Sequence, residues 1–178
     1  MADGGPRRKH PAAGATLAVE IVRRESGWTR AKVTDALLKR AARAALQAAA
    51  SRAGPSYRVT LLLTGDAEMR GLNRAWRGKD APTNVLSFPA DTVKDRGFLG
   101  DIVLAYATTR KEASEQGIPV SDHASHLVVH GMLHLLGFDH IEDKDARRME
   151  RIERIALASI GVADPYAGTD PRHAEVSP

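Results

Sequence analysis

Four histidines lie within one apolar stretch, HLVVHGMLHLLGFDH, at residues 126–140 of a chain that has seven in total. His126, His130 and His134 are four residues apart, so in a helix each neighbouring pair lies on one face. His140 follows His134 by six residues, and a continuous helix would rotate it by roughly 240°. It can join the others only if the chain turns, and Gly137 can take the left-handed conformation that ends a helix.

This spacing predicts a metal site formed by His130, His134 and His140. Three imidazoles match the ligand number of a catalytic zinc that keeps its fourth position open for water. The sequence contains no cysteine, so a metal must be held by His, Asp or Glu. We therefore expect one Zn²⁺ per chain.

The sequence leaves the outer part of this site open. His126 lies one turn before His130 and could support a ligand from behind, shuttle protons or simply lie at the surface. A fourth protein ligand would close the site and make the zinc structural rather than catalytic. The candidates for that ligand are Asp139, His126 and Asp101.

The pattern H-x-x-x-H-x-x-G-x-x-H is also that of metzincin proteases, whose helix carries Glu directly after the first histidine as general base. Here Gly131 occupies that position. Loss of such a base often costs about 10²-fold or more in rate, so peptide hydrolysis is the second choice. A glycine inside a helix costs roughly 1 kcal/mol relative to alanine, which indicates that either substrate or a packed neighbour comes close to it.

The elements that must position these histidines follow from periodicity and turn signals. Alternating or continuous apolar runs predict four strands, and apolar residues at helical spacing predict helices between and after them. The last helix is expected to bury Met149, Ile152, Ile155 and Ser159 on one face. The predicted strands are residues 16–23, 57–64, 83–89 and 100–108.

The length of 178 residues suits one globular domain, which we place at residues 16–163. Residues 1–15 and 164–178 have no sustained period, and we expect a disordered basic tail and a disordered second tail. No apolar run approaches the ~20 residues that span a bilayer, and the N-terminus lacks the apolar centre of a signal peptide. We therefore expect a cytoplasmic protein without membrane contact.

Positive charge is concentrated rather than spread. The formal net charge is only +4, but residues 30–52 hold six basic residues against the single acid Asp35 and are expected to form one helix. Taken alone, such a helix is explained better by a solvated outer face than by contact with nucleic acid. The basic residues are Arg30, Lys32, Lys39, Arg40, Arg43 and Arg52.

Three blocks of sequence, taken together, resemble the YbeY family of bacterial metal-dependent endoribonucleases. The blocks are HGMLHLLGFDH, LNRAWRGKDAPTNVLSFP at residues 72–89 and GDIVLA at residues 100–105. The resemblance covers roughly residues 56–160 and implies a zincin-like α+β fold with a mixed sheet of about four strands. It also implies zinc at His130, His134 and His140 and cleavage of single-stranded RNA. The implied roles are 3′-end formation of small-subunit rRNA and ribosome quality control, with the small subunit and its assembly factors as partners.

The resemblance also assigns residues that would bind RNA. Arg77 matches the arginine of the family's [YW]-R-G-K-D segment, and its guanidinium could hold two phosphoryl oxygens in the transition state. Without the metal motif, an ion pair of Arg77 with Asp80 or Asp66 would be the preferred explanation. Lys79 could assist as a second charge.

Three further expectations remain open at this stage. The basic face with Lys39, Arg40 and Arg43 becomes a candidate RNA track. Trp76, Phe88 and Phe138 could stack on bases or belong to the core. No general base is evident, so attack by water and by the ribose 2′-hydroxyl both remain possible, and a ribosome-assembly factor with a structural zinc is a third candidate function.

Overall fold

The computed structural model describes residues 15–49, 56–91, 97–140 and 142–167. Its four strands form one sheet in the order β1-β2-β4-β3. β1 pairs with β2 and β2 with β4 in parallel, whereas β3 runs antiparallel to β4. The strands are β1 Thr16–Arg23, β2 Ser56–Thr64, β3 Val85–Pro89 and β4 Phe98–Ala105. The predicted α+β class and four-stranded mixed sheet are therefore confirmed.

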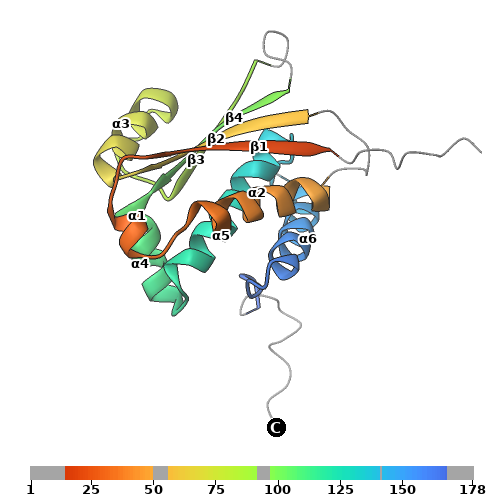
Figure 1. Ribbon diagram of the computed structural model, residues 1–178. Helices are drawn as coiled ribbons and strands as arrows, with labels where there is room; N and C mark the ends of the chain where they lie inside the picture. The colour runs from red at the N-terminus through yellow and green to blue at the C-terminus, as the bar shows by residue number, and fades with distance from the viewer. Residues whose placement is uncertain (1–14, 50–55, 92–96, 141, 168–178) are drawn as a thin grey trace, which may run out of the picture.

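The helices are divided between the two faces of the sheet. Figure 1 shows α2, α5 and α6 beneath the sheet, with α3 on its other side. The helices are α1 Gly27–Arg30, α2 Asp35–Ala49, α3 Asp66–Arg77, α4 Tyr106–Gln116, α5 Val120–Leu135 and α6 Asp143–Ser159. Helix α5, which carries His126, His130 and His134, is packed between the sheet and the helices α2 and α6.

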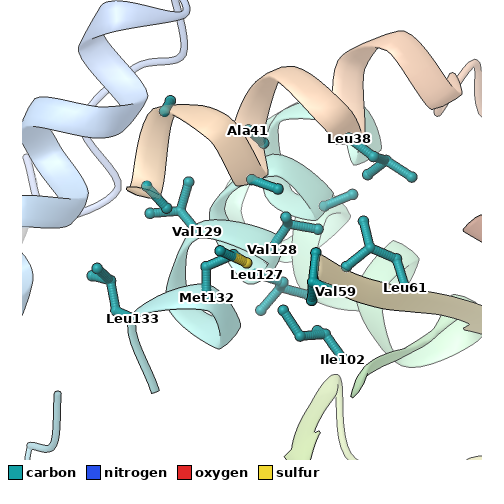
Figure 2. Close-up of a cluster of buried hydrophobic side chains, with 14 of the residues drawn as sticks. Leu38, Ala41, Val59, Leu61, Ile102, Leu127, Val128, Val129, Met132 and Leu133 are labelled. Atoms are coloured by element: carbon teal, nitrogen blue, oxygen red, sulfur yellow. The ribbon is translucent and has the colours of Figure 1, made fainter. Parts of the chain in front are cut away.

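The main core fills the space between the sheet and α5. Val59 and Leu61 point from β2 and Ile102 points from β4 toward Val128 and Met132 of α5, as Figure 2 shows. All five side chains are at most 1% exposed. Strand β4 is buried on both faces, since Val103 and Ala105 pack beneath α3, and this explains its continuous apolar run. The core thus fixes α5 as a rigid support for the site.

The predicted basic helix over residues 30–52 is wrong as a single element. Helix α1 ends at Arg30, and Lys32 takes a positive φ of 59°, so the chain turns before α2 begins. Of the six basic residues, those on α2 are Lys39, Arg40 and Arg43. Arg52 lies outside the described residues.

The predicted strand over residues 100–108 ends three residues early, at Ala105, because helix α4 begins at Tyr106. The side chain of Asp66 binds the first turn of this helix. The Asp66 carboxylate accepts the backbone N–H groups of Ala107 and Thr108 at 3.0 and 3.1 Å and the Thr108 hydroxyl at 2.6 Å. An acidic side chain at this position satisfies the free N–H groups of the first turn of α4. Asp66 therefore serves the start of α4 as well as lying in the first turn of α3.

The predicted buried face of the last helix is rotated. Ile155 is 55% exposed, whereas Met149, Glu153, Ala156 and Leu157 are buried. The sequence pattern favoured isoleucine over glutamate for the inner face, and the structure places a carboxylate there instead.

The predicted tails can be compared with the structure only in part. Residues 1–14 and 168–178 lie outside the described residues. Asp164 and Tyr166 are described and contact α6, through Arg154 and Glu153 respectively, so these contacts extend past the predicted boundary at residue 163. Within the described part of the chain, no helix has the length and apolar character to cross a membrane.

Candidate metal centre

A glycine turn at the end of α5 brings the third histidine back to the first two. Gly137 has a φ of 88°, in the left-handed region. The N–H of Gly137 donates to the carbonyl of His134, and the N–H of Phe138 donates to that of Leu133, both at 3.0 Å. These two bonds form a Schellman motif, which ends a helix and reverses the chain. The predicted role of Gly137 is confirmed.

The three imidazoles of His130, His134 and His140 face one another. Each offers a ring nitrogen, and these nitrogens all lie within 4.8 Å of one another. The Nε2 atoms of His130 and His134 are 3.0 Å apart. Two nitrogens bound to a tetrahedral zinc at about 2.0–2.1 Å would be about 3.3 Å apart, so this pair needs little movement to hold one ion.

The lowered pKa of His134 also favours metal binding. Burial, followed by the positive charges of His130 and His140, lowers the pKa of His134 below its usual value. A metal ligand must be a neutral imidazole, so a lowered pKa reduces the competition by protons. The donor set therefore fits a divalent metal ion, and the His130, His134 and His140 cluster could hold one.

Behind the cluster, a buried carboxylate orients the first histidine. Glu153 of α6 is 1% exposed, and its Oε1 lies 2.7 Å from Nδ1 of His130. Tyr166 donates its hydroxyl to the other carboxylate oxygen. An ionised carboxylate can only accept, so Nδ1 of His130 donates to it, and whenever the ring is neutral its lone pair lies on Nε2, toward the cluster.

Burial by itself raises the pKa of Glu153, but its polar neighbours outweigh that effect. Contacts with His126, His130 and Tyr166, together with the charge of His130, bring the pKa down to about 2. The carboxylate is therefore ionised at neutral pH although it is buried. Sequence reasoning missed Glu153, which contacts His130 directly.

None of the candidates for a fourth protein ligand joins the cluster. His126 contacts Glu153, with 3.6 Å between its Nε2 and the Oε2 of the carboxylate. Asp139 accepts the backbone N–H of His140 at 2.7 Å. Asp101 lines a different pocket, on the α3 side of the sheet. In the part of the chain that the structure describes, the cluster comprises three histidines.

The histidines open into a pocket of about 580 Å³ that Arg77 also lines. Arg77 is the last residue of α3 and is exposed. Asp80 pairs with Arg70 at 2.7 Å, and Asp66 binds the start of α4, so the two carboxylates considered for an ion pair are engaged elsewhere. The guanidinium of Arg77 is therefore available to a ligand in the pocket of the histidines.

The other predicted RNA-binding residues lie outside this pocket. Lys79 is exposed in the loop after α3 but does not line the pocket. The pocket lining comes from Arg77, from residues 83–89 and from the end of α5 with the turn that follows, and α2 contributes none of it. Arg40 and Arg43 are exposed and Lys39 is half-buried on α2.

A second, partly buried polar group supports the pocket wall. Glu112 of α4 accepts a hydrogen bond from the Asn84 side chain at 2.9 Å and lies 2.7 Å from Nε2 of His123, which is 4% exposed. Asn84 in turn accepts the N–H of Val85 at 2.7 Å and lines the pocket. Sequence reasoning missed this group, and its one signal was a histidine on the inner side of α5.

Gly131 is explained by packing against the sheet. A Cβ at this position would lie 2.9 Å from Cγ2 of Ile102 and 3.0 Å from Oγ of Ser87. The choice left open by the sequence is therefore settled in favour of a packed neighbour. The close contact lets α5 approach β3 and β4 at the level of the histidines.

Known proteins resemble this chain in sequence and in fold. The family model for endoribonuclease YbeY matches residues 25–161. The endoribonuclease YbeY of Parvibaculum lavamentivorans is 43% identical over 184 residues, covering 95% of this chain and 97% of that protein. That of Rhizorhabdus wittichii is 52% identical over 122 residues, covering 63% of this chain and 72% of that protein. The solution structure of TM1509 from Thermotoga maritima matches with a TM-score of 0.53 at 23% identity, covering 86% and 98% of the two chains. The chain therefore belongs to the endoribonuclease YbeY family.

Proposed function

We propose that this protein is a zinc-dependent endoribonuclease specific for single-stranded RNA. The observation that carries the proposal is the shared pocket, in which Arg77 and the histidines His130, His134 and His140 line one cavity. Cleavage of a phosphodiester needs charge stabilisation on the phosphoryl oxygens and an activated nucleophile. One pocket that offers a metal-binding cluster and an exposed guanidinium meets both needs.

The residues of this chain have separate tasks in that reaction. His130, His134 and His140 would hold a zinc ion, which would supply Lewis-acid chemistry to the reaction. Glu153 keeps the proton of His130 on Nδ1 and so keeps Nε2 directed at the ion. Arg77 holds two phosphoryl oxygens with its planar guanidinium and stabilises the extra negative charge of the transition state.

We further propose that the substrate is ribosomal RNA, and that the protein acts in 3′-end processing of small-subunit rRNA and in ribosome quality control. Family membership supports this role, with the small subunit and its assembly factors as cytoplasmic partners. The cations of α2, Lys39, Arg40 and Arg43, together with Lys79, would add phosphate contacts beyond the pocket. Such contacts supply affinity that weakens as salt is raised.

A metalloprotease is less well supported. The position of the metzincin general base is Gly131, where even a Cβ would meet Ile102 and Ser87. A glutamate there would point into the sheet rather than into the pocket. A binding factor with a structural zinc is also less well supported, because the described residues bring three protein donors together and structural zinc sites have four.

The test compares a labelled single-stranded RNA with a duplex of the same sequence. We expect the zinc-loaded protein to cut the single strand, and chelation to abolish cleavage while most of the thermal stability remains, since this domain has its own core. His134→Ala, purified in parallel, should be inactive. Cleavage that persists in this variant, or after chelation, would reveal a contaminating nuclease and contradict the proposal.

A further inference from the structure

A second pocket, of about 600 Å³, lies on the α3 side of the sheet. Its floor is apolar and includes Leu62 of β2 and Val103 of β4, and one wall is formed by Leu72 and Trp76 of α3. Helix α3 covers only part of this face, and the buried cluster between the helix and the sheet is correspondingly small. We call this pocket the sheet-face groove.

An exposed aromatic pair forms the rim of the sheet-face groove. Trp76 is 71% exposed, and its ring meets that of Phe88 edge to face with 5.5 Å between centroids. Within the described residues, Trp76 and Ile155 are the exposed large apolar side chains. A flat ring held by a second ring and open to solvent can stack on a nucleic-acid base without regard to sequence.

The groove continues from the pocket of the histidines. Pro89 lines both. At the end of α3, Trp76 lines the groove and Arg77 lines the pocket of the histidines. On β3, Phe88 lines the groove and Ser87 the pocket, because successive strand residues point to opposite faces. An extended strand whose phosphate meets Arg77 can therefore pass over Pro89 and place its next bases beside Trp76.

The charges around the groove suit a polyanion with its bases turned inward. Residues 70–80 hold four cations, Arg70, Arg74, Arg77 and Lys79, against one acid, Asp80. Asp101, inside the groove, would repel a phosphate but can accept hydrogen bonds from the amino group of a base. These four cations lie on α3 and the loop after it, beside the groove, and the cation that lines the groove itself, Arg24, pairs with Glu68. Cations beside the groove and an acceptor among apolar side chains are the arrangement expected of a groove for single-stranded nucleic acid.

We propose that the sheet-face groove binds the bases of single-stranded RNA next to the scissile phosphate, with Trp76 and Phe88 as the stacking platform. This inference rests on the proposed function, since it extends the same substrate beyond the metal pocket. It also accounts for specificity for single strands, because only unpaired bases can turn into the groove.

The test measures binding through tryptophan fluorescence. The chain has two tryptophans, and Trp28 is 0% exposed with its ring N–H bonded to the carbonyl of Thr64, so quenching by RNA reports on Trp76. A short single-stranded RNA is titrated into the chelated wild type and into His134→Ala. We expect quenching in both, because binding in the groove does not need the metal.

Variants then separate stacking from other contacts. Binding by the variants is measured by the fluorescence anisotropy of end-labelled RNA, because replacing Trp76 removes the fluorescent reporter. Trp76→Leu should weaken binding by about tenfold or more, as loss of one stacked base does, and Trp76→Phe should restore part of it. Ile155→Ala, on the other exposed apolar side chain, is the matched control and should bind as the wild type does. Circular dichroism should show all three variants folded, since both positions are exposed.

Two results would overturn the inference. One is RNA binding that leaves the tryptophan emission unchanged, or that Trp76→Leu does not weaken. The other is self-association of the wild type that Trp76→Leu abolishes, which would assign the groove to a second copy of the chain. Failure of the proposed function is distinguishable, because the wild type would then quench with RNA but cut none when zinc is supplied.

Discussion

Replacing Glu153 with glutamine tests whether the buried carboxylate holds the metal centre together. The substitution keeps the shape of the side chain but removes the charge that accepts from His130 and Tyr166. Loss of such a partner behind a metal ligand typically costs 10–100-fold in metal affinity. We expect a loss of about that size when Zn²⁺ binding is measured by competition with a chelator.

The same variant should change how stability depends on pH. The pKa of Glu153 falls from 4.5 to about 2 on folding. A lowered pKa stabilises the folded state above pH 4.5, and this contribution is lost as pH falls through the folded pKa. At about 1.4 kcal/mol per unit, the contribution is about 3 kcal/mol at neutral pH and half of that or less at pH 3.

The assay is urea unfolding of the metal-free proteins at pH 5 and pH 3. The wild type should be more stable than Glu153→Gln at pH 5, and the difference should narrow by about 2 kcal/mol at pH 3. Glu115→Gln is the control, because this exposed residue pairs with the exposed Lys111 one turn away. An equal difference at both pH values, with unchanged zinc affinity, would refute the role given to Glu153.

Four further predictions test the site and its supports. The purified protein should hold about one zinc per chain by elemental analysis and His134→Ala should lose it; retention of the metal by the variant would remove this residue from the ligands. Arg77→Lys should cut RNA at least about tenfold more slowly while binding it nearly as well, and a wild-type rate would exclude the phosphate clamp. Combined replacement of Lys39, Arg40 and Arg43 by glutamine should weaken RNA binding and flatten its salt dependence without loss of zinc, and an unchanged salt slope would exclude α2 as a track. Gly131→Ala should lower the free energy of unfolding by about 1 kcal/mol, because overpacking against Ile102 and Ser87 exceeds the gain in helix propensity. Gly71→Ala, where a Cβ would have no atom within 4 Å, should raise the free energy of unfolding. Equal gains in stability at both sites would contradict the packing argument.

The sequence alone predicted the centre of the site because local geometry determines it. Histidines four residues apart must share a helix face, and Gly137 supplies the one backbone conformation that returns His140 to them. The four strands followed from apolar patterning in the same way. These features depend on residues close together in the chain, and the structure agrees with them.

The supports of the site could not be predicted because they depend on contacts between distant residues. Glu153 lies 23 positions from His130, and Glu112 lies 28 from Asn84. A glutamate on a helix is normally solvated, so the pattern of α6 favoured Ile155 for the inner face. Only the tertiary packing of α6 on α5 shows that the carboxylate is inside and the isoleucine outside.

The contact of Gly131 with Ile102 and Ser87 also limits how this protein can change in evolution. Glycine and glutamate codons differ by as little as one base, so the metzincin motif is close in mutational steps. The sheet, however, occupies the space that the new side chain would need. The conversion would require smaller residues on β3 and β4 at the same time, and each intermediate would carry a cavity or a clash. A nuclease and a protease can thus share a histidine spacing yet be separated by several unfavourable substitutions.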